Sequence, residues 1–417
     1  MMRYLTNPLS LLLSVWTIAL ASYLGGVFTG LFPPVEPVTV TAVLLSLAAF
    51  ALGYLTWSLF KQLSPASEEP RIPMTRPLCT KTMARFLGFC LLMGLLAVLG
   101  SLYRIAVIAK FFDTSFMELL THPTALRLRL VMYIEASQSQ INSIPIVISL
   151  ASSFMAIGFV LLGVYLFVER RLIKFVYLAA FLFVTLFIGL TNLSRQEVTV
   201  NVLYLLLAYG VMYASSARKS PRNAVVDLVL PLASVVLLFA VIDTLLGKSS
   251  AYGHVDRLRG TLFSFYWYVA APLAAFNEFL HNFEGSHHYG QYLFWPFYKW
   301  LYRFELVPEP TFSFYSEMTY LPFMANVYTY LRNVYEDFGM IGIAVVPYGL
   351  GWLTCALRSK AYRSLPFLNL YLILLVLIIF SFYNYYLIAN QVYLQALFGF
   401  LFFQGDLRSW DELPAAA

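Results

Sequence analysis

Residues 365–382 read LPFLNLYLILLVLIIFSF, a run without a charged side chain. The hydrocarbon core of a bilayer is about 30 Å thick, and a helix needs about 20 apolar residues to cross it. The run does not alternate in short segments as the strands of a membrane β-barrel do. Because lipid offers no hydrogen-bond partner to the backbone, the run predicts a membrane-spanning helix.

Similar runs recur along the chain. Of its 417 residues, 60% are hydrophobic and only 12% are charged, whereas soluble domains carry roughly 25% charged residues. The sequence therefore predicts an all-α polytopic integral membrane protein with about ten spans. We expect the first apolar run to be a retained span and not a removable leader. The predicted spans are 8–31, 38–60, 86–109, 145–168, 175–192, 197–214, 225–246, 338–357, 365–383 and 387–403.

Basic residues gather in alternate loops. The segments 61–85, 169–174, 215–224 and 358–364 hold most of the Lys and Arg side chains, and short links on the other side hold none. This asymmetry places these loops, and both termini, in the cytoplasm. The net charge of +6 follows from these loops and does not predict nucleic-acid binding.

Two segments on the opposite side are too long to be simple links. They are 110–144 and 247–337, and loops of such length are often functional. The second contains an apolar stretch at 260–280. Counting it as a span would place the basic loop 358–364 outside, so we predict a helix that lies on or dips into the outer face. The chain then divides into a seven-span bundle (1–246), a large periplasmic loop (247–337) and three spans (338–417).

The strongest local pattern is NVYTYLRNVYEDFG at residues 326–339, which leads into an apolar span. Thr329, Arg332 and Glu336 share one face at helical spacing. Such a polar stripe at the mouth of a helix suits a sugar or a lipid headgroup. The alternative is an interfacial anchor, because Tyr and Arg commonly lie at the headgroup level.

Arginines mark two further places on the outer side. Arg195 lies in the polar patch TNLSRQE (191–197), and Arg257 and Arg259 precede the aromatic-rich stretch. A guanidinium binds phosphate with two parallel hydrogen bonds. The alternatives are a snorkelling Arg195 and solvated loop charges at 257 and 259.

The sequence contains no signature of a metal or nucleotide site. The adjacent His287 and His288 lack the spacing of a metal motif, and the three cysteines form no ligand set. A phosphate-binding loop and a serine-hydrolase elbow are also missing. We therefore expect no metal and no cofactor.

The run 326–339, with the upstream run GQYLFWPFYKWLYR (290–303) and the Ser194-Arg195 turn, resembles the bacterial oligosaccharide repeat-unit polymerases of the Wzy type. The resemblance implies a metal-independent glycosyltransferase of membrane-embedded, GT-C-like architecture in the bacterial inner membrane. Its substrates would be undecaprenyl-diphosphate-linked oligosaccharides, polymerised into O-antigen, capsule or exopolysaccharide at the periplasmic face. A chain-length-regulating co-polymerase is an implied candidate partner besides the bilayer, and nucleic acid is not.

Breaking a sugar–diphosphate bond requires cations at the leaving group and a base for the acceptor hydroxyl. We expect the Arg195→Ala and Arg332→Ala variants to lose polymer at unchanged protein levels. The candidate site residues fall into three groups: Arg195, Arg257 and Arg259 for the diphosphate; Arg332, Glu336 and Asp337 for catalysis; and Tyr266, Tyr268, Asn277, His281, Asn326, Tyr328 and Thr329 for the sugar.

Two other functions remain open. An O-antigen ligase would perform the same chemistry with lipid A core as the acceptor, but the 326–339 run favours the polymerase. A non-enzymatic transporter of polysaccharide or lipid-linked oligosaccharide would place polar groups at the midplane of the bundle, whereas here they gather at the outer face. Neighbouring genes for a flippase and a chain-length regulator would favour the polymerase.

Overall fold

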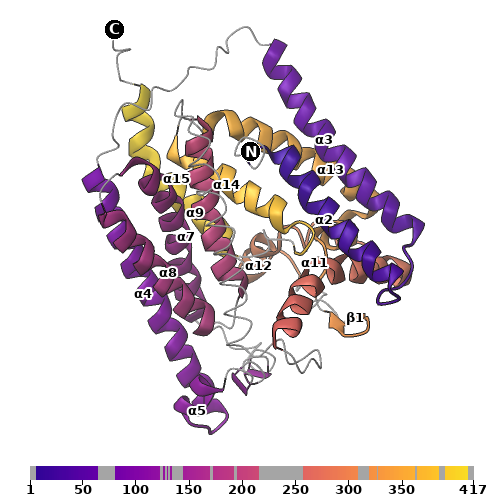
Figure 1. The fold of residues 1–417 in the computed structure, drawn as a ribbon, viewed down its shortest axis with the longest axis horizontal. Coiled ribbons are helices and arrows are strands. Elements are labelled where there is room, and N and C mark those ends of the chain that lie inside the picture. The colour runs from indigo at the N-terminus through magenta and orange to yellow at the C-terminus, as the bar shows by residue number, and fades with distance from the viewer. Residues whose placement is uncertain are drawn as a thin grey trace.

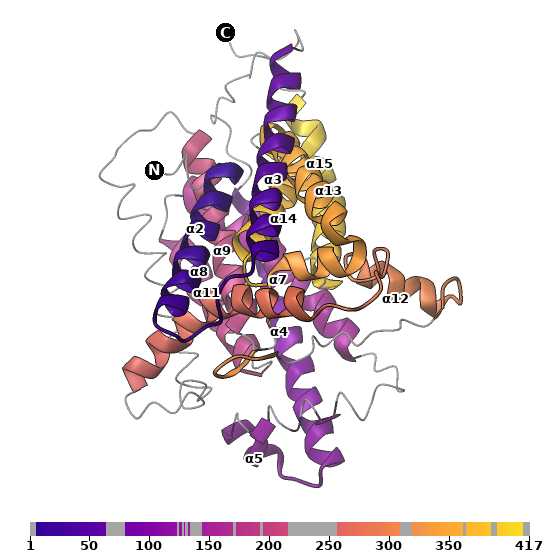
Figure 2. The same cartoon turned by 90° about the vertical axis from the view of Figure 1, so that its right-hand side faces the viewer.

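The structure is a computed structural model, in which the chain forms a bundle of long helices (Figures 1 and 2). The described residues are 6–63, 80–122, 125–126, 129, 132–133, 144–169, 172–191, 195–215, 257–308, 319–325, 327–361, 364–384 and 390–411.

Seven described helices are long and apolar enough to cross a membrane, which makes the chain a multi-pass all-α membrane protein. They are α2 (Pro8–Phe28), α3 (Pro37–Leu63), α4 (Thr80–Phe111), α7 (Ile144–Val168), α8 (Ile173–Thr191), α9 (Arg195–Ser215) and α13 (Tyr330–Ala361). The shorter apolar α14 (Leu365–Phe380) and the 22-residue α15 (Asn390–Asp411), which is not among the candidate spans, follow them.

The predicted spans agree with these helices in order and place. Seven of the ten coincide with the candidate spans, and 365–383 and 387–403 coincide with α14 and α15. The predicted span 225–246 lies outside the described residues. The largest boundary differences lie at α4, which begins at Thr80 instead of 86, and at α15, which extends to Asp411 instead of 403. In α13 a further helical part precedes the predicted span 338–357.

Burial divides the bundle into a centre and a lipid-facing shell. In α7, 83% of the apolar window is buried, against 28% in α4 and α8. Nearly every residue of α14 is buried as well. The outer helices keep large apolar side chains exposed, such as Leu52 on α3 and Leu99 on α4. A water-soluble protein would not expose a continuous surface of this kind, so lipid must cover it.

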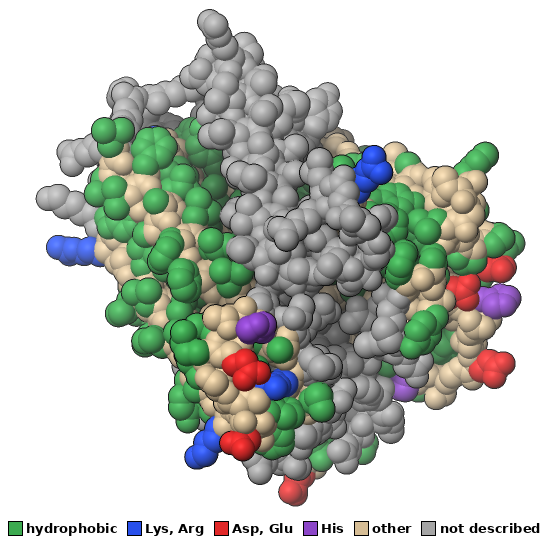
Figure 3. All heavy atoms as spheres, turned by 60° about the horizontal axis from the view of Figure 1, so that its bottom comes forward, with side chains coloured by type: hydrophobic (Ala, Val, Ile, Leu, Met, Phe, Trp, Pro, Cys, Tyr) green, Lys and Arg blue, Asp and Glu red, His purple; other side chains and the backbone are tan. Residues whose placement is uncertain are grey.

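Four small elements gather at one end of the bundle, called here the loop face. They are α5 (Phe116–Thr121), α12 (Trp295–Arg303), and the two-residue strands β1 (Thr319–Tyr320) and β2 (Met324–Ala325), which form an antiparallel pair. Figure 3 turns this end toward the reader. Charged and histidine side chains gather there, while hydrophobic side chains cover the sides.

Helix α11 (Arg257–Asn282) contains the apolar stretch predicted to lie at the surface. It is 26 residues long with Pro272 inside, and it is not among the candidate spans. Figure 2 shows it lying across the bundle at the loop face, crosswise to α3. Its middle turns are buried against the bundle, because Ala270, Ala271 and residues 273–276 pack into the core.

Helices α3 and α13 pack more extensively against each other than any other pair. A Cβ atom at Gly53 would overlap the carbonyl oxygen of Tyr348, and one at Gly351 would overlap that of Phe50. Small residues allow membrane helices to approach at backbone distance. This contact fixes α13, and with it the polar residues at its first turns.

Candidate functional site

The start of α13 is fixed from three sides. The Tyr330 N–H donates to the Ser381 carbonyl (3.0 Å), and the Tyr330 hydroxyl bonds Ser46 of α3 (2.7 Å). The Trp16 indole N–H of α2 donates to the Ser381 hydroxyl (2.8 Å). Helices α2, α3 and α14 therefore hold the first turn of α13 in place.

Arg332 lies on this turn and forms a buried ion pair. Its Nη2 atom is 3.2 Å from Oε1 of Glu336, one turn later, and both residues are only 6% exposed. The guanidinium carbon lies 4.0 Å from the ring centre of Tyr328 and 4.7 Å from that of Phe279. A guanidinium over aromatic faces gains cation–π attraction, which is strongest away from water. We call these four residues, together with Thr329, the Arg332 site.

Several donors of the Arg332 site are not used. The Nε and Nη1 atoms of Arg332 and the Oγ1 atom of Thr329 are buried, and none has a hydrogen-bond partner among the described residues. Leaving a buried polar group unpaired costs about 1–3 kcal/mol, and more for a charged group. The Nε–H and the Nη1 N–H groups lie on different edges of the guanidinium, so each is a separate charged donor. The Arg332 site is therefore suited to anionic oxygen atoms such as those of a phosphate or carboxylate.

Asp337 holds a distant part of the chain. It is fully buried, and its two carboxylate oxygens accept the N–H groups of Tyr292 (3.1 Å) and Leu293 (2.7 Å). The carbonyls of Glu336 and Asp337 also accept the N–H groups of His288 (3.0 Å) and Tyr289 (3.1 Å). The geometry makes Asp337 a positioning residue for segment 287–293, and its role as a general base stays a prediction.

A helix break makes this attachment possible. Gly339 has φ 60° and ψ −150°, so α13 divides into residues 330–338 and 340–361. The break frees carbonyls at the end of the first part, and segment 287–293 supplies their partners. A Cβ atom at position 339 would lie 2.9 Å from Nε2 of His287. Glycine is thus required both for the positive φ and for the close approach.

Exchange of Asp337 for asparagine should release segment 287–293. The carboxamide NH2 would face one of the two backbone donors, and an unpaired buried N–H costs about 1–3 kcal/mol. We expect a lower melting temperature in detergent and faster proteolytic cleavage between residues 287 and 303. The control is Glu284→Gln, because Glu284 is exposed in the same connection. Equal cleavage of both variants would contradict the positioning role.

Other predicted sugar-binding residues have structural partners. Asn277 is 1% exposed; its Oδ1 atom accepts the Glu36 N–H (2.8 Å) and its Nδ2 atom donates to the Pro34 carbonyl (3.1 Å). It ties α11 to the link between α2 and α3, which leaves no carboxamide group turned toward a ligand. His281 pairs with Glu36 at 3.5 Å on the surface. This pair is mostly solvated and does not reach the Arg332 site.

The predicted sugar-binding tyrosines of α11, and Tyr328 just before α13, have separate partners. The Tyr266 hydroxyl donates to the Ser22 carbonyl (2.9 Å), and burial raises the pKa of Tyr266, so it stays a donor. Tyr268 packs against Tyr383 (5.5 Å). Tyr328 bonds the hydroxyl of Thr319 on β1. Of these three tyrosines, Tyr328 is the one in contact with Arg332.

The structure does not bring all predicted arginines together. Arg259 is exposed on the first turn of α11, and 20 residues separate it from Phe279, roughly 30 Å along a helix. Arg259 and Arg332 therefore do not form one clamp. Arg195 and Arg257 are the first residues of α9 and α11, and their side chains lie outside what the structure describes, as does Asn326.

Sequence reasoning does not predict two of the contacts around the first part of α13. Phe279 reads as one more apolar residue of α11, and segment 287–293 reads as a loop with a histidine pair. Gly339, at the end of the motif, was the sequence signal for the helix break that segment 287–293 occupies, because a glycine after a polar helical turn predicts the end of a helix. Within the described residues, no group of three or more His, Cys, Asp or Glu is placed to hold a metal ion.

Comparison of the chain with family models, curated proteins and solved structures gave no match. The family resemblance therefore stays a prediction from the motif residues. The Arg332 site itself has to carry any functional argument.

Proposed function

We propose that the chain is a membrane-embedded glycosyltransferase of GT-C-like architecture that polymerises undecaprenyl-diphosphate-linked oligosaccharides. The loop face would lie on the periplasmic side of the bacterial inner membrane, with both termini in the cytoplasm. The observation that carries the proposal is the buried guanidinium of Arg332, whose Nε and Nη1 donors have no partner among the described residues. The motif around it is the one that resembles the Wzy-type polymerases.

The Arg332 site would bind the diphosphate of the donor. When the bond between the sugar and the diphosphate breaks, negative charge grows on the leaving group, and fixed donors stabilise it. Glu336 orients the guanidinium through the ion pair, and Tyr328 and Phe279 hold it from the ring side. Since the unused donors are closed to solvent, the ligand would reach them after a shift of the Tyr328 ring or of segment 287–293.

The apolar outer surface of the bundle also supports a lipid-linked substrate. The Arg332 site lies at the start of α13, against Phe279 of α11, in a bundle whose outer helices expose large apolar residues. A polyprenyl tail could therefore remain in lipid while its diphosphate reaches the start of α13. Arg195, at the start of α9, remains a candidate for a second contact with a lipid-linked diphosphate, and a chain-length-regulating co-polymerase remains a candidate partner.

Purified protein in lipid nanodiscs should convert a lipid-linked repeat unit into a ladder of glycans without added nucleotide or metal. Each rung should add one repeat unit, and undecaprenyl diphosphate should be released in step, as gel electrophoresis and mass spectrometry would show. Transfer to lipid A core instead of repeat units would indicate the ligase. Movement of the lipid-linked unit across a vesicle membrane without bond cleavage would indicate the transporter.

A further inference from the structure

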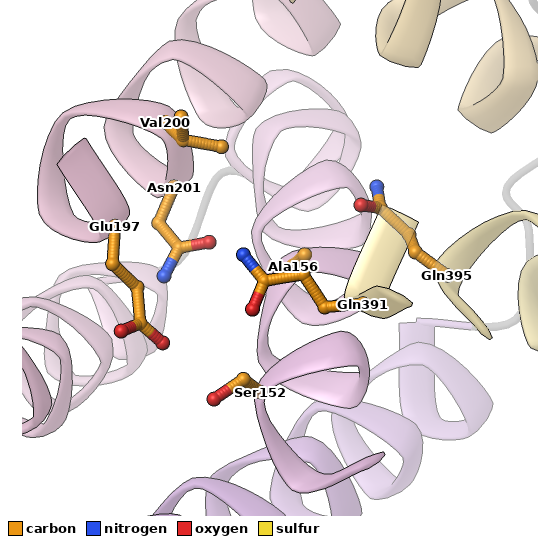
Figure 4. Close-up of a pocket in the computed structure, with 7 residues that line it drawn as sticks. All are labelled: Ser152, Ala156, Glu197, Val200, Asn201, Gln391 and Gln395. Atoms are coloured by element: carbon orange, nitrogen blue, oxygen red, sulfur yellow. The ribbon is translucent and has the colours of Figure 1, made fainter. Parts of the chain in front are cut away.

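A second polar cluster lies inside the bundle, around a small cavity between α7, α9 and α15 (Figure 4). Figure 4 shows the side chains of Glu197, Asn201, Gln391 and Ser152 pointing toward one another around this space. We call it the Glu197 pocket. Its lining comprises Ser152, Ala156, Glu197, Val200, Asn201, Gln391 and Gln395.

The Glu197 pocket combines the half-buried Glu197 and Gln391 with fully buried neighbours. Gln395 is 1% exposed and Asn201 is 4% exposed. The Gln395 Nε2 atom donates to Oδ1 of Asn369 (3.1 Å), and Nδ2 of Asn369 donates back to the Gln395 carbonyl (3.1 Å). Ser153 fixes the start of α15 by donating to the Gln391 carbonyl (3.1 Å). Helix α14 thus holds the α15 side of the pocket in position through Asn369.

One polar group that lines the cavity is available to bind a ligand. The Ser152 hydroxyl is buried, lines the cavity and has no hydrogen-bond partner among the described residues. Its residue is 6% exposed. Polar and charged groups inside a membrane bundle are costly and commonly mark a functional path or site. A carboxylate, two carboxamides and a hydroxyl that face one space exceed what helix packing requires.

Size and charge select the ligand group. The cavity has room for a group about the size of one water molecule. The guanidinium of Arg104 on α4 interacts electrostatically with the Glu197 carboxylate. Arg104 therefore disfavours the binding of a cation in the pocket, and the Glu197 carboxylate disfavours the binding of an anion. Carboxamides both donate and accept hydrogen bonds. A neutral group that also does both, namely a hydroxyl, fits these conditions.

The Glu197 pocket lies near the starts of two helices. Glu197 is two residues after Arg195, the first residue of α9, and Gln391 is the second residue of α15. Helix α12 links this region to the Arg332 site. Leu293, two residues before α12, bonds Asp337 (2.7 Å), and Phe297 on α12 packs against Tyr393 on α15 at 4.9 Å between ring centres.

We propose that the Glu197 pocket binds the attacking hydroxyl of the acceptor sugar and that Glu197 takes its proton, an inference that rests on the proposed polymerase function. The hydroxyl oxygen forms a bond to the anomeric carbon of the donor sugar as the bond from that carbon to the diphosphate breaks. The electron pair of the broken bond leaves with the diphosphate, and the hydroxyl proton passes to Glu197. Asn201, Gln391 and Ser152 orient the hydroxyl.

The Glu197→Gln variant tests this role in the nanodisc polymerisation assay. It keeps the size and hydrogen bonding of the side chain but cannot take a proton, so polymerisation should slow by about 100-fold, the scale of general base catalysis. Binding of the lipid-linked repeat unit, followed by native mass spectrometry, should stay within about 3-fold of wild type. Loss of rate toward low pH, expected for wild type, should be absent in the variant.

Matched variants separate the chemistry from folding. Glu284→Gln removes an exposed carboxylate at the loop face and should polymerise at the wild-type rate. Ser152→Ala should raise KM for the repeat unit more than it lowers kcat, because the serine only orients the hydroxyl.

Two results would overturn the role of Glu197. In the first, the wild type polymerises and the Glu197→Gln variant has the same rate and pH profile. This result would reject the role of Glu197 alone and show that the pocket holds only water. A wild type that makes no polymer from its repeat unit would remove the proposed function, and the role of Glu197 with it.

Discussion

The Arg332→Lys variant should make at least about 100-fold less polymer than wild type while it still folds, because loss of one preorganised donor to a developing charge costs about that factor. Lysine keeps the positive charge, so Glu336 retains a partner inside the protein. It lacks the planar fork of donors and stacks poorly on the rings of Tyr328 and Phe279. The rate of release of undecaprenyl diphosphate in nanodiscs measures the effect directly.

Folding has to be separated from chemistry at this position. Arg332→Ala would leave Glu336 buried without its partner, which typically costs about 3–5 kcal/mol. Burial of the pair therefore adds an expected loss of stability to the loss of polymer that the sequence predicts for this variant. The double exchange Arg332→Met with Glu336→Met replaces the pair by apolar side chains and is often neutral for stability. It should fold, bind lipid and make no polymer.

A functional double variant would contradict the diphosphate role of Arg332. So would a lysine variant with the wild-type rate, since a general positive charge would then suffice. Tyr302, exposed on α12 away from the ion pair, provides a control position. Its exchange for phenylalanine should leave rate and melting temperature unchanged.

The bundle could be predicted from sequence because its cause is local. Runs such as 365–382 contain no charge, and lipid permits little else than a helix there. The basic residues of loop 358–364 led to the prediction that 260–280 is not a span. Helix α11, which contains this stretch, is not among the candidate spans and lies crosswise to α3. Helix boundaries were harder to predict. Helix α4 begins at Thr80 instead of 86 and α15 extends to Asp411 instead of 403, because polar residues continue both helices beyond their apolar runs.

The polar site was only partly predictable, because its contacts are distant in sequence. The pattern of Thr329, Arg332 and Glu336 predicted one shared face, and the structure pairs Arg332 with Glu336 on α13, with Thr329 just before the helix. The bonds from Asp337 to Tyr292 and Leu293 span about 45 residues, and no local spacing indicates them. Asn277 looked like a sugar ligand on α11, but its partners belong to the link between α2 and α3.

The Glu197 pocket shows the same limit. Its polar residues come from three helices that are far apart in the chain, and in each helix they look like isolated exceptions in an apolar run. The sequence predicted a functional residue in the patch 191–197, but that residue was Arg195. Helix packing brings its neighbour Glu197 to Asn201, Gln391 and Ser152 (Figure 4).

The Gly351→Ala variant should lower the free energy of unfolding by about 3 kcal/mol, which is large for a single methyl group. The added Cβ would overlap the carbonyl oxygen of Phe50 on α3, and a backbone atom cannot rotate away as a side chain can. The two helices would have to separate along the contact that packs most extensively in the bundle. Thermal unfolding in detergent, followed by circular dichroism, measures this effect.

Gly349→Ala in the same helix provides the matched control. A Cβ atom there meets nothing within 4 Å, so alanine should stabilise α13 by about 0.5–1 kcal/mol through its better helix propensity. The two glycines should thus respond with opposite signs although they lie two residues apart. Separation of α3 from α13 should also strain the Ser46–Tyr330 bond (2.7 Å), which holds the first turn of α13. Polymer formation by Gly351→Ala should therefore fall more than its folded fraction does, and an equal fall of both would show that the helix contact supports the fold without positioning Arg332.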